Sequence, residues 1–212
     1  MQIGQCVLVK NDANKIVYEI ESINNDMAKI NGIHYRICRN VNIIELEIAT
    51  LADIEAEKKK TEKYYYQVIN QKFRQERKYI LGTILHIDGD DTYLEKCLEL
   101  YSSLDVFAYG VKIKEKDMAR DIGGILNQIT PSIIVITGHD SYNSKGLSDL
   151  DNYTNTKNYM NTIKEIKHRD SNCCIIAGAC QSNFEALMAS GANFASSPKR
   201  INIHTFDPAV IA

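Results

Sequence analysis

A cysteine and a histidine each stand directly after a short apolar run of this sequence. Cys180 follows the run 173–179, and His139 follows the run 133–138. Short apolar runs closed by small residues predict buried strands. If the two strands are parallel neighbours, both side chains emerge at the same edge, where open α/β sheets bind ligands. A thiolate beside an imidazole is a nucleophile with its base, so Cys180 and His139 predict acyl-transfer chemistry.

The residues after Cys180 favour an ionised thiol. Ser182 and Asn183 are good helix-capping residues, and an apolar helical pattern begins at Phe184. A cysteine at a strand-to-helix junction lies near unpaired N–H groups and the positive end of the helix. Both stabilise the thiolate, which is the reactive form of cysteine.

Acidic residues follow a third apolar run, at 80–87. We expect its end to open onto the same sheet edge. Asp88 is therefore a candidate for binding a substrate guanidinium through a bidentate carboxylate contact, whereas Asp90 and Asp91 are predicted to cap the next helix. Further candidates for substrate contact are His86, Gln181 and Ser196.

Strand and helix patterns alternate from residue 80 onward. Strands are expected at 80–87, 106–111, 133–137, 173–177 and 191–196, with helices at 92–103, 116–128, 153–168 and 184–190. Alternating units of this length predict a doubly wound, mostly parallel α/β sheet over residues 80–212 with right-handed crossovers.

The first 79 residues have a different pattern. Residues 1–49 contain short segments that alternate with period two, separated by polar turns, and Asn31-Gly32 is a strong hairpin signal. These features predict a small SH3-like or Tudor-like β-barrel. Its charges nearly cancel, which favours docking or packing over nucleic-acid binding. Residues 50–79 are predicted to form a helical connector.

Composition excludes several classes of protein. The 212 residues are 44% hydrophobic and 25% charged, with a net charge of -2, so no global basic field suggests nucleic acid as a partner. No apolar run is long enough to cross a membrane, and the first residues lack the pattern of a signal peptide. The six cysteines are irregularly spaced, which favours free thiols inside a cell over a disulfide framework or a structural zinc site. We expect no metal and no organic cofactor.

Four motifs together resemble the YabG family of sporulation proteases. They are the segments 86–90, 135–140, 177–182 and 191–200, and the small β unit at the start fits the family as well. The resemblance implies a cysteine endopeptidase of endospore formers, located in the cytoplasm of the sporulating cell and associated with the spore. It implies spore-coat and germination proteins as substrates, cleavage after arginine, and processing of the protease itself. It also implies that family members continue beyond Ala212.

The order of strand, histidine, spacer, strand and cysteine is more distantly similar to the caspase and clostripain class, which implies a caspase-like sheet. In that class the backbone N–H groups of the nucleophile and of the residue after the histidine bind the oxyanion. These correspond to Cys180 and Asp140. The class has glycine where Asp140 stands, and a carboxylate near an oxyanion would oppose its stabilisation.

Two alternatives remain open from the sequence. The segment 178–182 is one residue short of the nucleophile elbow of glutamine amidotransferases, with His204 as the base, although Phe206 stands where that class has a carboxylate. The other is a non-catalytic α/β binding module in which Asp88 and Asp90 form a phosphate or metal site.

Overall fold

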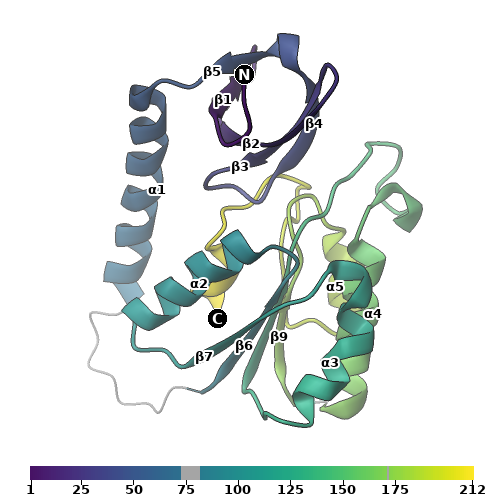
Figure 1. Cartoon of the computed structure of the whole chain (residues 1–212). Helices are drawn as coiled ribbons and strands as arrows, with labels where there is room; N and C mark the ends of the chain where they lie inside the picture. The colour runs from purple at the N-terminus through teal and green to yellow at the C-terminus, as the bar shows by residue number, and fades with distance from the viewer. Residues whose placement is uncertain (73–81, 171) are drawn as a thin grey trace. The chain divides into compact units, whose positions relative to one another are not determined.

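The structure is a computed structural model that describes residues 1–72, 82–170 and 172–212, with side chains omitted from residue 64 to the end of the first helix. The chain divides into two compact units, Met1–Ile80 and Leu81–Ala212 (Figure 1). Each has its own sheet, so the predicted α/β class is confirmed with an antiparallel sheet preceding a parallel one.

The first unit is built on five antiparallel strands in the order β4-β3-β2-β1-β5. Alternate side chains of these strands form its core, which includes Val7, Tyr18, Ile20 and Ile30, as period-two sequences require. The strands are β1 (Cys6–Val9), β2 (Val17–Asn24), β3 (Met27–Gly32), β4 (Cys38–Asn42) and β5 (Leu46–Ile48), with a 3₁₀ turn η1 (Ile43–Glu45) before β5.

The hairpin predicted at Asn31-Gly32 is present as the antiparallel pair β3–β4, but its turn lies in residues 33–36, directly after Gly32. The β2–β3 hairpin turns at Asn25, whose φ is +53°, and Asn31 and Gly32 both lie within β3. A Cβ at Gly32 would lie 2.5 Å from the carbonyl oxygen of Tyr35. This glycine therefore permits a close backbone approach and does not form a turn.

A single helix, α1 (Leu51–Lys72), occupies the described part of the predicted connector; residues 73–79 lie outside the described residues. Thr50 and Asp53 cap its first turn reciprocally, through bonds of 2.9 Å and 3.2 Å between side chains and backbone N–H groups. Glu57 ties the helix to the sheet, because its Oε2 accepts a hydrogen bond from the N–H of Val17 at 3.1 Å.

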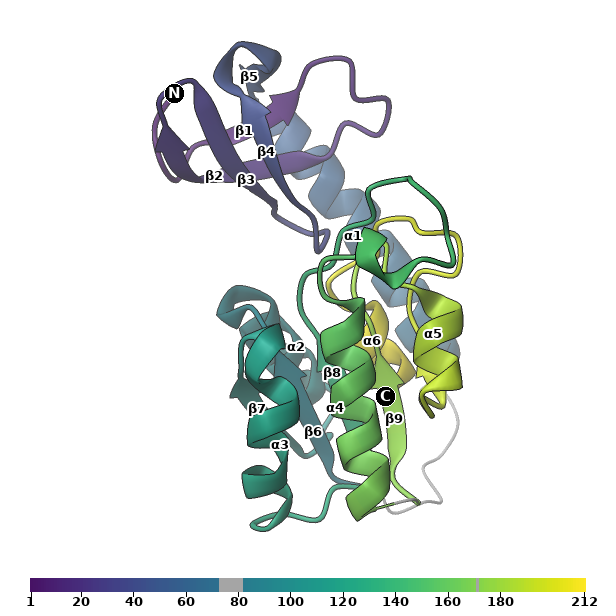
Figure 2. The same ribbon diagram turned by 90° about the vertical axis from the view of Figure 1, so that its right-hand side faces the viewer.

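The second unit is a parallel sheet in the order β10-β9-β8-β6-β7. Helices α3, α4 and α5 cover one face, and α2 and α6 lie over the other (Figures 1 and 2). The elements are β6 (Ile84–Asp88), α2 (Asp91–Ser103), β7 (Ala108–Lys112), η2 (Glu115–Asp117), α3 (Met118–Leu126), β8 (Ile133–Thr137), η3 (Leu150–Asn152), α4 (Thr156–Arg169), β9 (Cys174–Ala177), α5 (Phe184–Ala189), β10 (Phe194–Ala195) and α6 (Asp207–Ile211).

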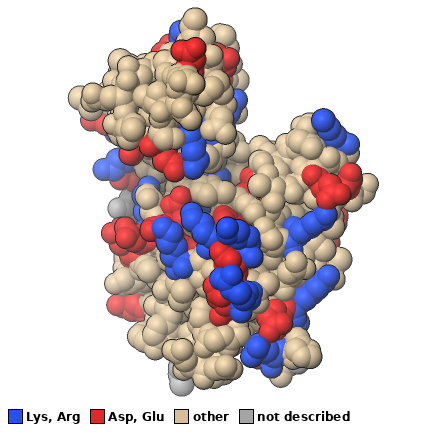
Figure 3. All heavy atoms as spheres, turned by 45° about the vertical axis from the view of Figure 1, so that its right-hand side comes forward, with Lys and Arg blue, Asp and Glu red and all other residues tan. Residues whose placement is uncertain are grey.

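The core of this unit lies between the sheet and helices α3 to α5. Alternate residues of the central strands, such as Leu85, Ile134 and Ile175, face it, as do Ile122 and Ile163 from the helices. On the face of this unit seen in Figure 3, Lys and Arg side chains are interspersed with Asp and Glu. None of the described helices is both long and apolar enough to span a lipid bilayer.

Candidate active site

His139 and Cys180 lie at the same edge of the parallel sheet. They follow the neighbouring strands β8 and β9, whose register places Ile136 opposite Ala177. Beyond the strands the two loops stay joined, because the N–H of Tyr142 donates to Oε1 of Gln181 at 3.0 Å. The predicted juxtaposition of these two segments at the carboxyl edge is therefore present in the structure.

The backbone of His139 is fixed on both sides. Its N–H donates to Glu115 Oε1 at 2.8 Å, and its carbonyl accepts bonds from Asn155 Nδ2 at 2.8 Å and Tyr159 Oη at 3.0 Å. Glycines on either side make room for the Glu115 carboxylate, since a Cβ at Gly89 or Gly138 would overlap it. The position of His139 is thus set by residues from η2 and α4 as well as by its own strand.

The imidazole of His139 contacts the start of α2. Its Nε2 lies 3.0 Å from Oδ2 of Asp90, and its ring meets Tyr93 edge to face, with centroids 5.7 Å apart. Nδ1 is buried and has no hydrogen-bond partner among the described residues. This nitrogen is therefore not engaged by any described group.

Asp90 performs two roles. As predicted, it caps α2, because Oδ1 accepts from the N–H groups of Thr92 at 2.9 Å and Tyr93 at 3.4 Å. Its second oxygen binds His139. Burial opposes ionisation of Asp90, but the hydrogen bond and charge of His139 and the capping N–H groups outweigh it and lower its pKa to about 2.

A chain of hydrogen-bonded, buried side chains leads from Asp90 into the interior of the unit. Asp88 Oδ1 accepts from the N–H of Asp90 at 3.0 Å, and its Oδ2 accepts from the Thr137 hydroxyl at 2.7 Å. Thr137 in turn lies 2.8 Å from Nε2 of His86, whose Nδ1 lies 3.1 Å from Tyr101 Oη. His86, Asp88 and Thr137 have no exposed surface. Asp88 and His86, which were predicted to contact substrate, thus lie in the interior. A substrate could reach them only if the residues that cover them moved.

The thiol of Cys180 is covered by a later segment of the chain. Only 2% of the residue is exposed. The N–H of Ile203 donates to Sγ at 3.2 Å, and Sγ lies 3.8 Å from the Ile203 carbonyl oxygen. Asn183 caps α5 through the N–H of Ala186 at 3.0 Å, as predicted.

The carboxylate of Asp140 points into the protein. It accepts bonds from the N–H groups of Ser141 at 2.9 Å and Asn155 at 2.7 Å, and from the Thr156 hydroxyl at 2.5 Å. Burial raises the pKa of Asp140 above its ordinary value, although Thr156, Asn155 and Ser182 oppose this effect. Its own N–H donates to no acceptor within the described ranges. In this conformation the carboxylate, which was expected to oppose an oxyanion, is therefore held by Ser141, Asn155 and Thr156.

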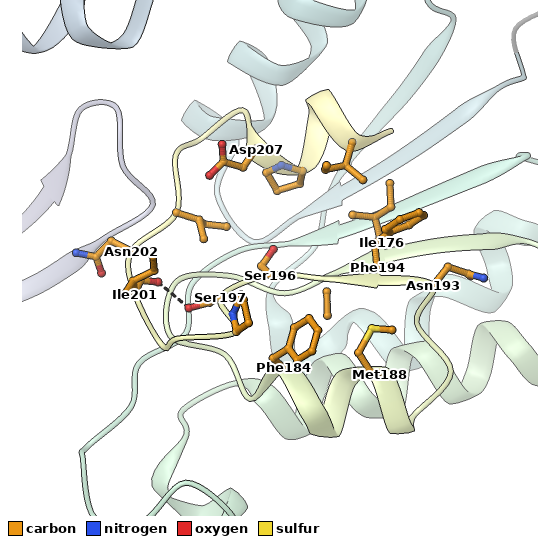
Figure 4. A pocket seen from close by; sticks show the side chains of 15 residues that line it. Ile176, Phe184, Met188, Asn193, Phe194, Ser196, Ser197, Ile201, Asn202 and Asp207 are labelled. Carbon is orange, nitrogen blue, oxygen red and sulfur yellow. Dashed lines mark hydrogen bonds between the residues drawn. The ribbon is translucent and has the colours of Figure 1, made fainter. Parts of the chain in front are cut away.

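Gln181 follows Cys180 directly, and Ser196 follows β10, the strand next to β9. The N–H of Gln181 donates to Ser197 Oγ at 3.1 Å, while Ser196 lines a mainly apolar cavity of about 400 Å³ (Figure 4). The cavity extends from β10 to α6, and its walls include Phe184, Met188 and Ile203. Ile203 is thus shared by the cavity and the cover over Cys180.

His204, the base in the amidotransferase alternative, is held within its own turn. Its Nδ1 accepts from the N–H of Phe206 at 3.2 Å, and its N–H donates to Asp207 Oδ2 at 2.9 Å. In the described parts of the chain, no three His, Cys, Asp or Glu side chains gather as metal ligands would. The Asp88–Asp90 pair thus gives no such cluster for the binding-module alternative.

Comparison with known proteins identifies the family. The model of the YabG peptidase U57 family matches residues 2–212. The chain belongs to this family. It is also 45% identical over 157 residues to the sporulation-specific protease YabG of Bacillus subtilis (strain 168), an alignment that covers 71% of this chain and 54% of that protein. The chain thus spans about half the length of this curated relative of the YabG family. No solved structure matches the chain.

Several residues that shape this YabG-family site carry no sequence signal of their own. Glu115, Asn155 and Tyr159 lie in different elements and meet only around the His139 backbone. Asp90 was identifiable as a helix cap but not as a partner of His139, which is 49 positions away.

Proposed function

We propose that this chain is the catalytic part of a cysteine endopeptidase, with Cys180 as nucleophile and His139 as base. The observation that carries the proposal is the placement of both segments at one sheet edge in a member of a peptidase family. Family membership also favours peptide hydrolysis over amide transfer or simple binding.

The reaction follows from the groups at this edge. The Cys180 sulfur attacks the carbonyl carbon of the scissile peptide bond, and its proton passes to Nδ1 of His139. The N–H groups of Asp140 and Cys180 stabilise the oxyanion. The C–N bond then breaks as His139 gives the proton to the departing amine, which leaves a thioester. A water molecule, deprotonated by His139, hydrolyses the thioester and restores the thiol.

Access to the sulfur requires a change in the cover. Because the Ile203 backbone lies against Sγ, a substrate carbonyl reaches Cys180 only when the segment 201–205 shifts. Gln181 and Ser196 flank this segment and are proposed to contact the substrate, as are Asp88 and His86 if they become accessible.

The substrates, the location and the finer fold follow from the family resemblance. We place the activity in the cytoplasm of the sporulating cell and on the spore, with spore-coat and germination proteins cleaved after arginine. The chain itself is a further substrate. The second unit is proposed to share the caspase arrangement, and the first to be an SH3-like or Tudor-like docking barrel.

Alanine variants of the full chain test the proposal on a peptide containing one arginine, with an arginine-to-alanine peptide for comparison. Cys180→Ala and His139→Ala should abolish cleavage, while Cys174→Ala and His204→Ala should retain it. Full cleavage by Cys180→Ala would overturn the proposal. Loss of activity in His204→Ala, with activity kept in His139→Ala, would favour the amidotransferase-type pairing instead.

A further inference from the structure

We infer that Asp90 is a positioning residue that orients His139 for catalysis. The inference rests on the proposed function, because it concerns the base of the Cys180–His139 pair. It adds a third member, supplied by the N-cap of α2, which neither the family match nor the curated relative assigns.

The contact with Asp90 decides which ring nitrogen of His139 carries the proton. An ionised carboxylate can only accept hydrogen bonds, so Nε2, at 3.0 Å from Oδ2, must be the protonated nitrogen. Nδ1 then presents a lone pair, and it is the nitrogen with no partner among the described residues. The neutral ring is therefore in the tautomer that can accept a thiol proton, and the imidazolium that results faces an anion.

Asp90 is held rigidly enough to act in this way. Two capping bonds from α2 fix its Oδ1, and its own N–H is bound to the buried carboxylate of Asp88. Rotation of the Asp90 side chain away from His139 would also break the cap of α2. Support of this kind fixes the geometry of a catalytic histidine.

The contacts of Asp90 favour its ionised form. Its pKa is lowered to about 2 because, against the cost of burial, His139 and two capping N–H groups favour the charged form. The neighbouring Asp91 differs, since its carboxylate is 55% exposed and pairs with Lys112 on the surface. Asp91 therefore provides a matched control at the adjacent position.

Asp90→Asn is the decisive variant. Asparagine caps helices as well as aspartate does, so α2 is retained, but the side-chain amide then turns an N–H group toward His139. This favours the proton on Nδ1 and removes the lone pair that the thiol needs. We expect kcat to fall by about 10²- to 10⁴-fold with KM changed by less than about threefold. Asp91→Asn should stay within about twofold of the wild-type kcat.

A tautomer measurement separates positioning from a general structural role. In ¹⁵N-histidine NMR spectra, with His139 assigned by comparison with His139→Gln, the wild-type ring should carry its proton on Nε2. Asp90→Asn should move it to Nδ1. A wild-type ring protonated on Nδ1, or a kcat within threefold of wild type in Asp90→Asn, would overturn the inference. Cleavage retained by Cys180→Ala would instead overturn the proposed function, and the NMR result would still decide whether Asp90 sets the tautomer.

Discussion

Two carboxylates that are at least partly buried, one in each unit, have pKa values shifted in opposite directions. Glu57 links α1 to β2 and is 7% exposed. Burial raises its pKa to about 7, and among the described residues this shift is opposed by the backbone N–H of Val17 and the charge of Lys60. Asp90 is partly buried, with 22% of its side chain exposed, and its pKa is about 2 although burial opposes ionisation. The hydrogen-bond partners of a carboxylate can therefore outweigh the cost of burying it.

Asp140 resembles Glu57 in the direction of its shift. Thr156, Asn155, Ser182 and Ser141 favour its charged form through hydrogen bonds, yet burial outweighs them and its pKa is raised. These N–H and O–H donors therefore do not match the effect that the contact with His139 has on Asp90. The following changes test this role of the partner at all three carboxylates.

The largest effect is expected for Asp140→Ala. This change leaves the Thr156 hydroxyl and the Asn155 N–H without their acceptor in the interior, and each lost partner costs about 1–3 kcal/mol. We expect the free energy of unfolding, measured in urea, to fall by about 3–5 kcal/mol. Asp151→Ala, an exposed carboxylate paired with Lys157, should cost less than about 1 kcal/mol. An equal loss of unfolding free energy in both variants would show that the hydrogen bonds of Asp140 do not stabilise the fold.

Glu57→Gln tests the carboxylate whose pKa is raised by burial. Because the folded pKa of about 7 exceeds the ordinary value of 4.5 for a glutamate, the folded protein binds more protons than the unfolded chain. The wild type should therefore lose about 2–3 kcal/mol of stability as pH rises from 5 to 8. Glutamine carries no charge, so thermal unfolding of Glu57→Gln should lack this loss and be more stable than wild type at pH 8. Glu55→Gln, which is exposed, is the control. The same decline in Glu57→Gln would assign the pH dependence to another group.

A smaller effect of opposite sign is expected for Asp90. Its folded pKa is about 2, below the ordinary value of 3.8 for an aspartate, so its contribution to stability is present above pH 3.8 and is lost as pH falls through 2. Asp90→Asn should be about 1–2 kcal/mol less stable than wild type at pH 7, and this deficit should shrink toward pH 2 in urea unfolding. A deficit that does not change with pH would mean that the charge of Asp90 does not stabilise the fold.

Local pattern was sufficient to predict the strands that carry His139 and Cys180. Both follow short apolar runs, and buried parallel strands have this composition whatever surrounds them. The α2 cap was likewise predictable from Asp90 and the residues after it. Family resemblance added the protease class, which the later comparisons support.

Contacts between residues far apart in the chain could not be predicted from local sequence patterns. Asp88 was predicted to bind substrate because it follows an apolar run, but it is fully buried and accepts a hydrogen bond from Thr137 of the adjacent strand β8. The cover over Cys180 comes from Ile203, 23 positions away, and α6 carries too short an apolar pattern to be predicted. Asn31-Gly32 indicated the β3–β4 hairpin, but this glycine serves a close backbone approach at the end of β3 and the turn follows it.

If Asp90 acts on Cys180 through His139, the reactivity of the thiol should depend on both residues together. The rate at which iodoacetamide modifies Cys180, identified by mass spectrometry, measures this in wild type, Asp90→Asn, His139→Ala and the double variant. Each single change should slow the reaction, and Asp90→Asn should have no further effect once His139 is absent. A double variant slowed by the product of the two single effects would show that Asp90 does not act through His139.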